Sequence, residues 1–66
     1  MSNDLPPVPA IDKLRAIERE IGFRRVVYPH RVTDGKMTQR QADWQLRVME
    51  AIRDDYLALA KSETLL

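Results

Sequence analysis

Apolar residues recur at helical spacing in two long runs, and only a short stretch of chain separates the runs. The first run consists of Leu14, Ile17, Ile21, Tyr28 and Val32, with Ile11 at its edge. The second consists of Ala42, Leu46, Met49, Ile52, Tyr56, Leu59 and Ala60. Such spacing places each set on one face of a helix, and the alternation of a half-buried strand is absent over any useful length. The pattern therefore predicts an all-α protein.

The end of the first run carries two residues that disturb a helix. Pro29 has no backbone N–H and disfavours the helical conformation at Tyr28, so we expect a kink or break near residues 26–29. Val32 keeps the apolar register, which predicts one further helical turn. Gly35 suits the left-handed conformation that ends such a turn. The first helix is therefore expected at about 10–33.

A helix-starting signal follows directly. Thr38 and Gln41 have the spacing of a capping box, in which each side chain bonds the backbone N–H of the other residue. Met37 precedes the cap and could pack on Ala42 as a hydrophobic staple. No glycine or proline interrupts the residues that follow. The second helix is therefore expected at about 39–61.

The chain has 66 residues, which is enough for one small domain. Residues 1–9 hold three of the four prolines, so we expect a disordered, proline-rich arm. Residues 10–62 form the predicted helical hairpin, because a short connection makes two helices antiparallel neighbours. Residues 63–66 are expected to fray.

Antiparallel helices that turn near residues 34–37 bring together residues whose numbers sum to roughly 70–73. This register places Ile21 near Met49 and Ile52, Leu14 near Tyr56 and Leu57, and Tyr28 near Ala42 and Gln45. Glu18 and Arg53 also meet the condition, so we expect an ion pair between the two helices at this position.

The apolar arc of each helix is wider than one neighbour can cover. Packing against a single helix needs a stripe a little over 100° wide, whereas the second helix carries an arc approaching roughly 200°. The excess positions are those expected to mediate self-association: Phe23, Val27, Trp44, Val48, Ile52 and Leu59. Clustered apolar surface marks an interface, which predicts a homodimer with a four-helix arrangement. A different protein covering the same surface is the alternative.

The sequence offers little for catalysis or for a cofactor. It has no cysteine, which removes disulfides, thiolate nucleophiles and cysteine metal sites. His30 is the only histidine, and a surface histidine in a bend explains it better than a general base oriented by Asp34. Glu50, Asp54 and Asp55 could form a carboxylate site, but Arg47 and Arg53 nearby favour a solvated charged face. We therefore expect neither an enzyme nor a bound metal or cofactor.

Basic residues gather around the expected bend. Residues 24–47 contain six basic and two acidic side chains, while the whole chain has a net charge of only +1. The basic ones are Arg24, Arg25, Arg31, Lys36, Arg40 and Arg47. Clustered cations with Tyr28 and Trp44 nearby could bind nucleic acid or an acidic protein surface. A near-neutral chain argues against a dedicated nucleic-acid binder, so this interpretation is the second choice.

Neither a membrane nor a secretory signal is expected. The apolar runs are far shorter than the roughly 20 residues that span a bilayer. The first ten residues, MSNDLPPVPA, lack the basic start and apolar core of a signal peptide. The sequence predicts a cytoplasmic protein.

The stretch RRVVYPHRVTDGKMTQRQADWQLRVMEAIRDDY resembles a run found in short, uncharacterised proteins of bacteriophages and bacterial prophages. The similar residues form the pattern Y-P-x-x-V-x-x-G-x-M from Tyr28 to Met37 and M-E-A-I-x-x-D-Y from Met49 to Tyr56. The resemblance covers about half the chain, from Arg24 to Tyr56. It implies a phage-related helical protein and brings no activity or catalytic residue. The leading expectation is a small, non-enzymatic interaction or adaptor protein.

Overall fold

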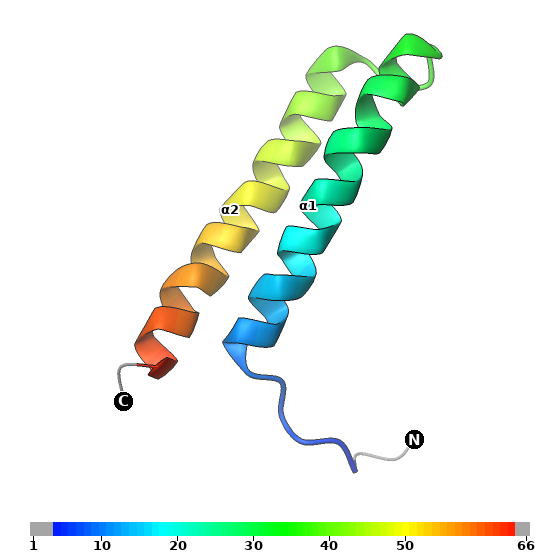
Figure 1. Ribbon diagram of the computed structural model, residues 1–66. Coiled ribbons are helices and arrows are strands. Elements are labelled where there is room, and N and C mark those ends of the chain that lie inside the picture. Colours follow the sequence, from blue (N-terminus) through cyan, green and yellow to red (C-terminus); the bar gives the residue numbers. More distant parts are fainter. Residues whose placement is uncertain (1–3, 65–66) are drawn as a thin grey trace.

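Two antiparallel α-helices joined by one short bend make up the computed structural model, which describes residues 4–64 (Figure 1). Helix α1 spans Ala10–Thr33 and helix α2 spans Gln39–Thr64. The bend lies at one end of the hairpin, and α1 begins and α2 ends at the other end. There is no strand within the described residues. The predicted all-α helical hairpin is confirmed.

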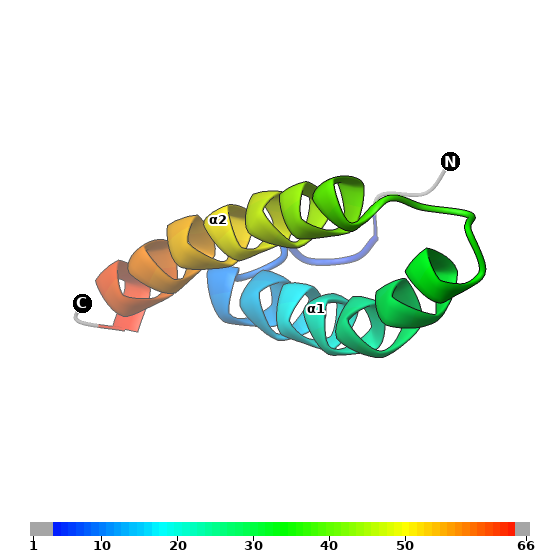
Figure 2. The same ribbon diagram turned by 90° about the horizontal axis from the view of Figure 1, so that it is seen from above.

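The hairpin is a single layer of helices (Figure 2). Its principal extents are 46 × 32 × 14 Å, so the molecule is long and thin. Such a layer has two broad faces and two outer edges. Each helix can bury only the stripe that it turns toward the other helix.

Helix α1 runs through Pro29 without a break, so of the predicted kink or break, the break is wrong. Pro29 is exposed, and its missing N–H deprives only the Arg25 carbonyl of a helical hydrogen bond. Tyr28 on one side of it is buried and Val32 on the other is half-buried. Burial of these two side chains stabilises the helical conformation across the proline.

The far ends of the helices are tied together. The backbone N–H of Ala10, at the start of α1, donates to Glu63 Oε2 on α2 at 3.0 Å. A carboxylate is favourable there because the first N–H groups of a helix have no partner within it. Helix α2 consequently extends to Thr64, beyond the predicted end at residue 61, and the predicted fraying is wrong for Glu63 and Thr64. Leu65 and Leu66 lie outside the described residues.

The bend satisfies the backbone groups of both helix ends. Gly35 has the predicted positive φ of 74°, and its N–H donates to the Val32 carbonyl at 3.1 Å. The Lys36 N–H donates to the Arg31 carbonyl at 2.9 Å, which completes a Schellman motif.

The predicted capping box is confirmed at the start of α2. The Thr38 N–H donates to Gln41 Oε1 at 2.9 Å, and the Gln41 N–H donates to Thr38 Oγ1 at 3.0 Å. These bonds satisfy donors that would otherwise be unpaired at the first turn of the helix. Groups only three residues apart therefore define where α2 begins.

The core is a narrow seam between the two helices. The buried side chains are Ala10, Leu14, Ile21, Tyr28, Ala42 and Ala60. Tyr56 is half-buried and packs against the cluster of Ala10, Leu14 and Ala60, in agreement with the predicted facing of Leu14 and Tyr56. None of the described side chains falls below 2% exposure, so a lone hairpin holds a thin core.

Alanine substitution of each of the two glycines tests the backbone conformation of the bend. We expect Gly35→Ala to lower the free energy of unfolding by about 1 kcal/mol, because alanine is strained at positive φ. Gly22→Ala should raise the free energy of unfolding by about 0.5–1 kcal/mol, because alanine favours a helix interior. An added Cβ meets nothing within 4 Å at either position, so packing does not confound the comparison.

Urea unfolding followed by circular dichroism, at one fixed protein concentration, measures both values. Two changes of the same sign would contradict the assigned bend.

Candidate functional site: an apolar face and an exposed tryptophan

Two contacts between the helices each mark one broad face of the hairpin, and so show which residues of α1 and α2 share a face. Arg25 Nη2 donates to Glu50 Oε2 at 3.0 Å across one broad face of the hairpin. The Lys13 ammonium lies 5.6 Å from the centroid of the Tyr56 ring across the other. At about 100° per residue, Lys13 and Arg25 fall on opposite sides of the buried stripe of α1. The two broad faces therefore differ in composition.

The face marked by Lys13 and Tyr56 is apolar on its α2 side, whereas α1 places the charged residues Lys13, Glu20 and Arg24 on it. On the same flank of the buried stripe, α1 also contributes Ile17 and Val27, and α2 contributes Val48, Ile52, Tyr56 and Leu59. Five of these six side chains are half-buried, and Leu59 is 46% exposed. We call this set the apolar face: Ile17, Val27, Val48, Ile52, Tyr56 and Leu59. It contains four of the six residues expected to mediate self-association.

Phe23 and Trp44, the other two, lie elsewhere. Phe23 is 60% exposed and Trp44 is 64% exposed. Each lies about 155° around its helix from the buried stripe, so they project from opposite outer edges of the hairpin. The structure therefore does not bring these two aromatic residues together with the apolar face.

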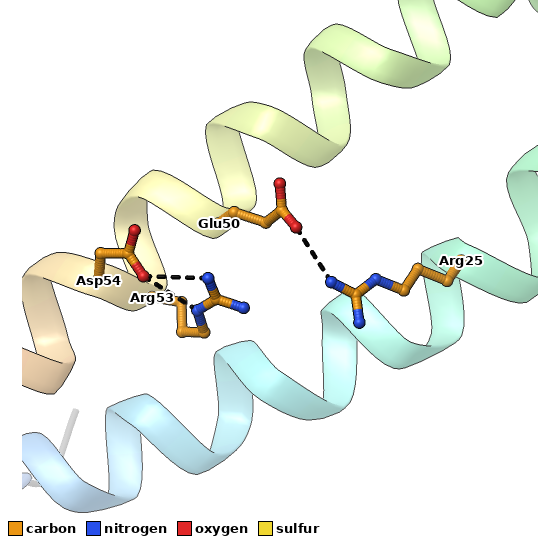
Figure 3. A network of polar contacts seen from close by, with 4 residues as sticks. All are labelled: Arg25, Glu50, Arg53 and Asp54. Carbon is orange, nitrogen blue, oxygen red and sulfur yellow. Dashed lines mark hydrogen bonds and ion pairs between the residues drawn. The ribbon is translucent and has the colours of Figure 1, made fainter.

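The opposite broad face is charged (Figure 3). Arg25 reaches from α1 to Glu50 on α2, while Arg53 donates through Nε and Nη2 to Asp54 at 3.1 and 3.0 Å. The predicted ion pair between Glu18 and Arg53 is wrong, because Arg53 bonds its neighbour in sequence instead. Glu18 and Arg53 do line one shallow pocket of about 220 Å³ with Ile21 and Arg25. Exposed pairs of this kind contribute little to stability.

The predicted basic patch is divided by these contacts. Arg24 Nε bonds Glu20 Oε1 at 2.8 Å, and its guanidinium lies 5.9 Å from the Tyr28 ring centroid. The hydrogen bond to Glu20 raises the pKa of Arg24 above its ordinary value, against the opposing effect of burial. Arg25 is bound to Glu50. Among the described residues, four members of the patch have no carboxylate partner: Arg31, Lys36, Arg40 and Arg47.

Two of these arginines flank the exposed tryptophan. Arg40 lies one turn before Trp44 on α2, and Arg47 lies one turn after it. With Asp43 they line a shallow depression of about 440 Å³. The Asp43 carboxylate accepts a hydrogen bond from Gln39 Nε2 at 2.9 Å. We call Arg40, Trp44 and Arg47 the tryptophan platform.

The candidate catalytic and metal-binding groups are not assembled into a site. His30 is an exposed residue in the last turns of α1. Glu50 pairs with Arg25, and Asp54 pairs with Arg53. Within residues 4–64, no three histidine, aspartate or glutamate side chains are grouped so that they could hold a metal ion. Neither α1 nor α2 has an apolar stretch of the length needed to cross a lipid bilayer.

Comparisons with protein-family models, curated proteins and solved structures match nothing to this chain. The resemblance to short phage proteins therefore stays a prediction.

Sequence reasoning missed two members of the apolar face and the grouping of the platform. Ile17 and Tyr56 were assigned wholly to the seam between the helices, whereas both are half-buried and reach the broad face. The i−4 and i+3 spacing of Arg40 and Arg47 about Trp44 was visible in the sequence. All three residues also belong to larger predicted sets.

Trp44 is the only tryptophan, so its fluorescence reports on the platform. We expect iodide to quench it several-fold more strongly than caesium at low ionic strength, because Arg40 and Arg47 attract the anion. The double variant Arg40→Gln with Arg47→Gln should reduce this preference. Equal quenching by the two ions, or protection from neutral acrylamide, would contradict the described position of Trp44.

Proposed function

We propose that this chain is a small, non-enzymatic interaction protein whose first partner is a second copy of itself, bound through the apolar face. The observation that carries the proposal is the position of Val27, Val48, Ile52 and Leu59 on one broad face of a hairpin with a thin core. A 66-residue chain without disulfides has a small core and gains stability from additional burial. Stacking two hairpins on this face supplies that burial as a four-helix arrangement.

The charge distribution favours a second copy over an unrelated partner. Residues 24–47, on the bend half of the hairpin, carry six basic and two acidic side chains, a net charge of +4. The remaining residues carry five basic and eight acidic side chains, a net charge of −3. A copy turned end for end places its acidic half against the basic half of the first.

The same arrangement selects one symmetry. A two-fold axis across the middle of the hairpin stacks α1 on α1 and α2 on α2, with the two bends at opposite ends. A two-fold axis along the hairpin would place both bends together, with like charges side by side. The Glu20–Arg24 pair lies near the middle of α1. An end-for-end copy brings Glu20 of one protomer near Arg24 of the other, and the reverse.

Association through one face leaves the charged face and both outer edges free. These surfaces, including Phe23 and the tryptophan platform, are available to other molecules, which suits an adaptor. An origin in a phage or prophage remains part of the proposal, supported by the resemblance from Arg24 to Tyr56.

We expect Ile52→Asp to weaken self-association by about 100-fold or more, because it buries an unpaired carboxylate in each protomer. Leu59→Asp should act in the same direction and lies at a more exposed position. Val26→Asp is the matched control, since Val26 is 65% exposed and lies outside the apolar face. Sedimentation velocity at physiological salt, with circular dichroism to verify folding, measures the effect.

A wild-type protein that sediments as a monomer at high micromolar concentration would overturn the proposed self-association. So would a control variant that dissociates as fully as Ile52→Asp.

The absence of cysteine allows a direct test of the end-for-end orientation. A spin label on Lys36→Cys in the bend should lie on the order of 40 Å from its copy, close to the length of a 26-residue helix. Bends placed together would bring the two labels within about half that distance. Double electron–electron resonance on the labelled dimer separates the two arrangements.

A further inference from the structure

We propose that the tryptophan platform, formed by Arg40, Trp44 and Arg47, binds single-stranded nucleic acid. This site lies outside the apolar face and does not depend on the proposed dimer. Its ligand class follows from three properties: an exposed aromatic ring, two cations beside it, and a shallow open shape.

The aromatic ring has no structural role in the hairpin. Trp44 lies on the outer edge of α2 with 64% of its surface exposed, and it lines a depression of about 440 Å³. An exposed indole offers a flat apolar surface on which an unpaired base can stack. Stacking of this kind tolerates any base, so it favours binding without strong sequence preference.

The two cations are placed to hold phosphates on either side of a stacked base. Arg40 and Arg47 are seven residues apart, which separates their Cα atoms by about 10.5 Å along the helix axis. Neither guanidinium has a carboxylate partner in the described part of the chain. Asp43, the acidic residue of the depression, is held by the Gln39 amide at 2.9 Å.

The track of free cations runs in one direction from the platform. Lys36 in the bend continues it beyond Arg40 and is exposed. On the other side of Arg47, the next charged residues of α2 are acidic Glu50 and the Asp54–Asp55 pair, with Arg53 bound to Asp54. A short strand therefore runs from Arg47 toward the bend.

A single strand fits this surface better than the two rival ligands. In a duplex the bases are stacked on one another, so their faces cannot reach the indole. An acidic protein surface would satisfy Arg40 and Arg47 but has no need of an exposed tryptophan between them. The aromatic ring is therefore what selects the ligand class.

Fluorescence of Trp44 tests the proposal directly, because the chain has no other tryptophan. The probes are a twelve-nucleotide oligothymidylate, a twelve-base-pair duplex and a glutamate peptide of equal charge. We expect the single strand to quench Trp44 and to bind more tightly than either rival. Its affinity should fall with added salt, with a slope of about −0.7 for each phosphate neutralised.

Variants assign the binding to the platform, with fluorescence anisotropy of a labelled oligothymidylate as the readout. Trp44→Leu should weaken binding by about 10-fold or more through loss of stacking. Arg40→Gln and Arg47→Gln should each weaken it and make the salt slope shallower by about 0.7. Arg19→Gln is the control, because Arg19 is exposed on α1 and loses the same charge.

Three results would overturn the proposal. The first is the absence of both quenching and anisotropy change at millimolar oligothymidylate. The second is a loss of affinity in Arg19→Gln equal to that in the platform variants. The third is tighter binding of the glutamate peptide or of the duplex than of the single strand. The Ile52→Asp variant keeps the platform intact. Quenching retained in that variant would separate failure of self-association from failure of nucleic-acid binding.

Discussion

Two helices can bury side chains only in the one seam between them, and this constraint determines which surfaces of the molecule stay exposed. Each helix of the pair buries the stripe that it turns toward its neighbour, and everything else faces water. Here that stripe is lined by Leu14, Ile21 and Tyr28 on α1, with small alanines on α2 at both ends. The thin seam leaves the flanks only half covered. The candidate surfaces consist of side chains that the seam does not bury.

The sequence predicted those parts of the fold whose causes are local. Thr38 and Gln41 form their capping box from groups three residues apart, and Gly35 takes its positive φ within one turn. The errors came from contacts that close over long sequence separations. Pro29 does not break α1, because Tyr28 beside it is buried in the seam. Glu63 extends α2 because it bonds Ala10, which is 53 residues away.

At the candidate sites, one error came from long-range contacts and another from a local contact. A helical wheel drawn from the sequence shows which residues are not in the seam, but it does not show on which side of the hairpin each one lies. The contacts of Lys13 with Tyr56 and of Arg25 with Glu50 supply that information. They gather Val27 and Ile52 on one face and leave Trp44 on an outer edge. The ion pair expected for Arg53 failed because Asp54 was a nearer acceptor.

Separation of the two surfaces has a consequence for how they would work together. Burial of the apolar face takes no surface from Trp44, so self-association would not compete with a ligand at the platform. Two copies stacked end for end would present two platforms, one toward each end of a molecule 46 Å long. A strand long enough to reach both would gain affinity through effective concentration, whereas a short strand would not. The dependence of affinity on oligonucleotide length therefore connects the two proposals. In a dimer, affinity should rise steeply once the strand is long enough to span both platforms, whereas a monomer has only one platform.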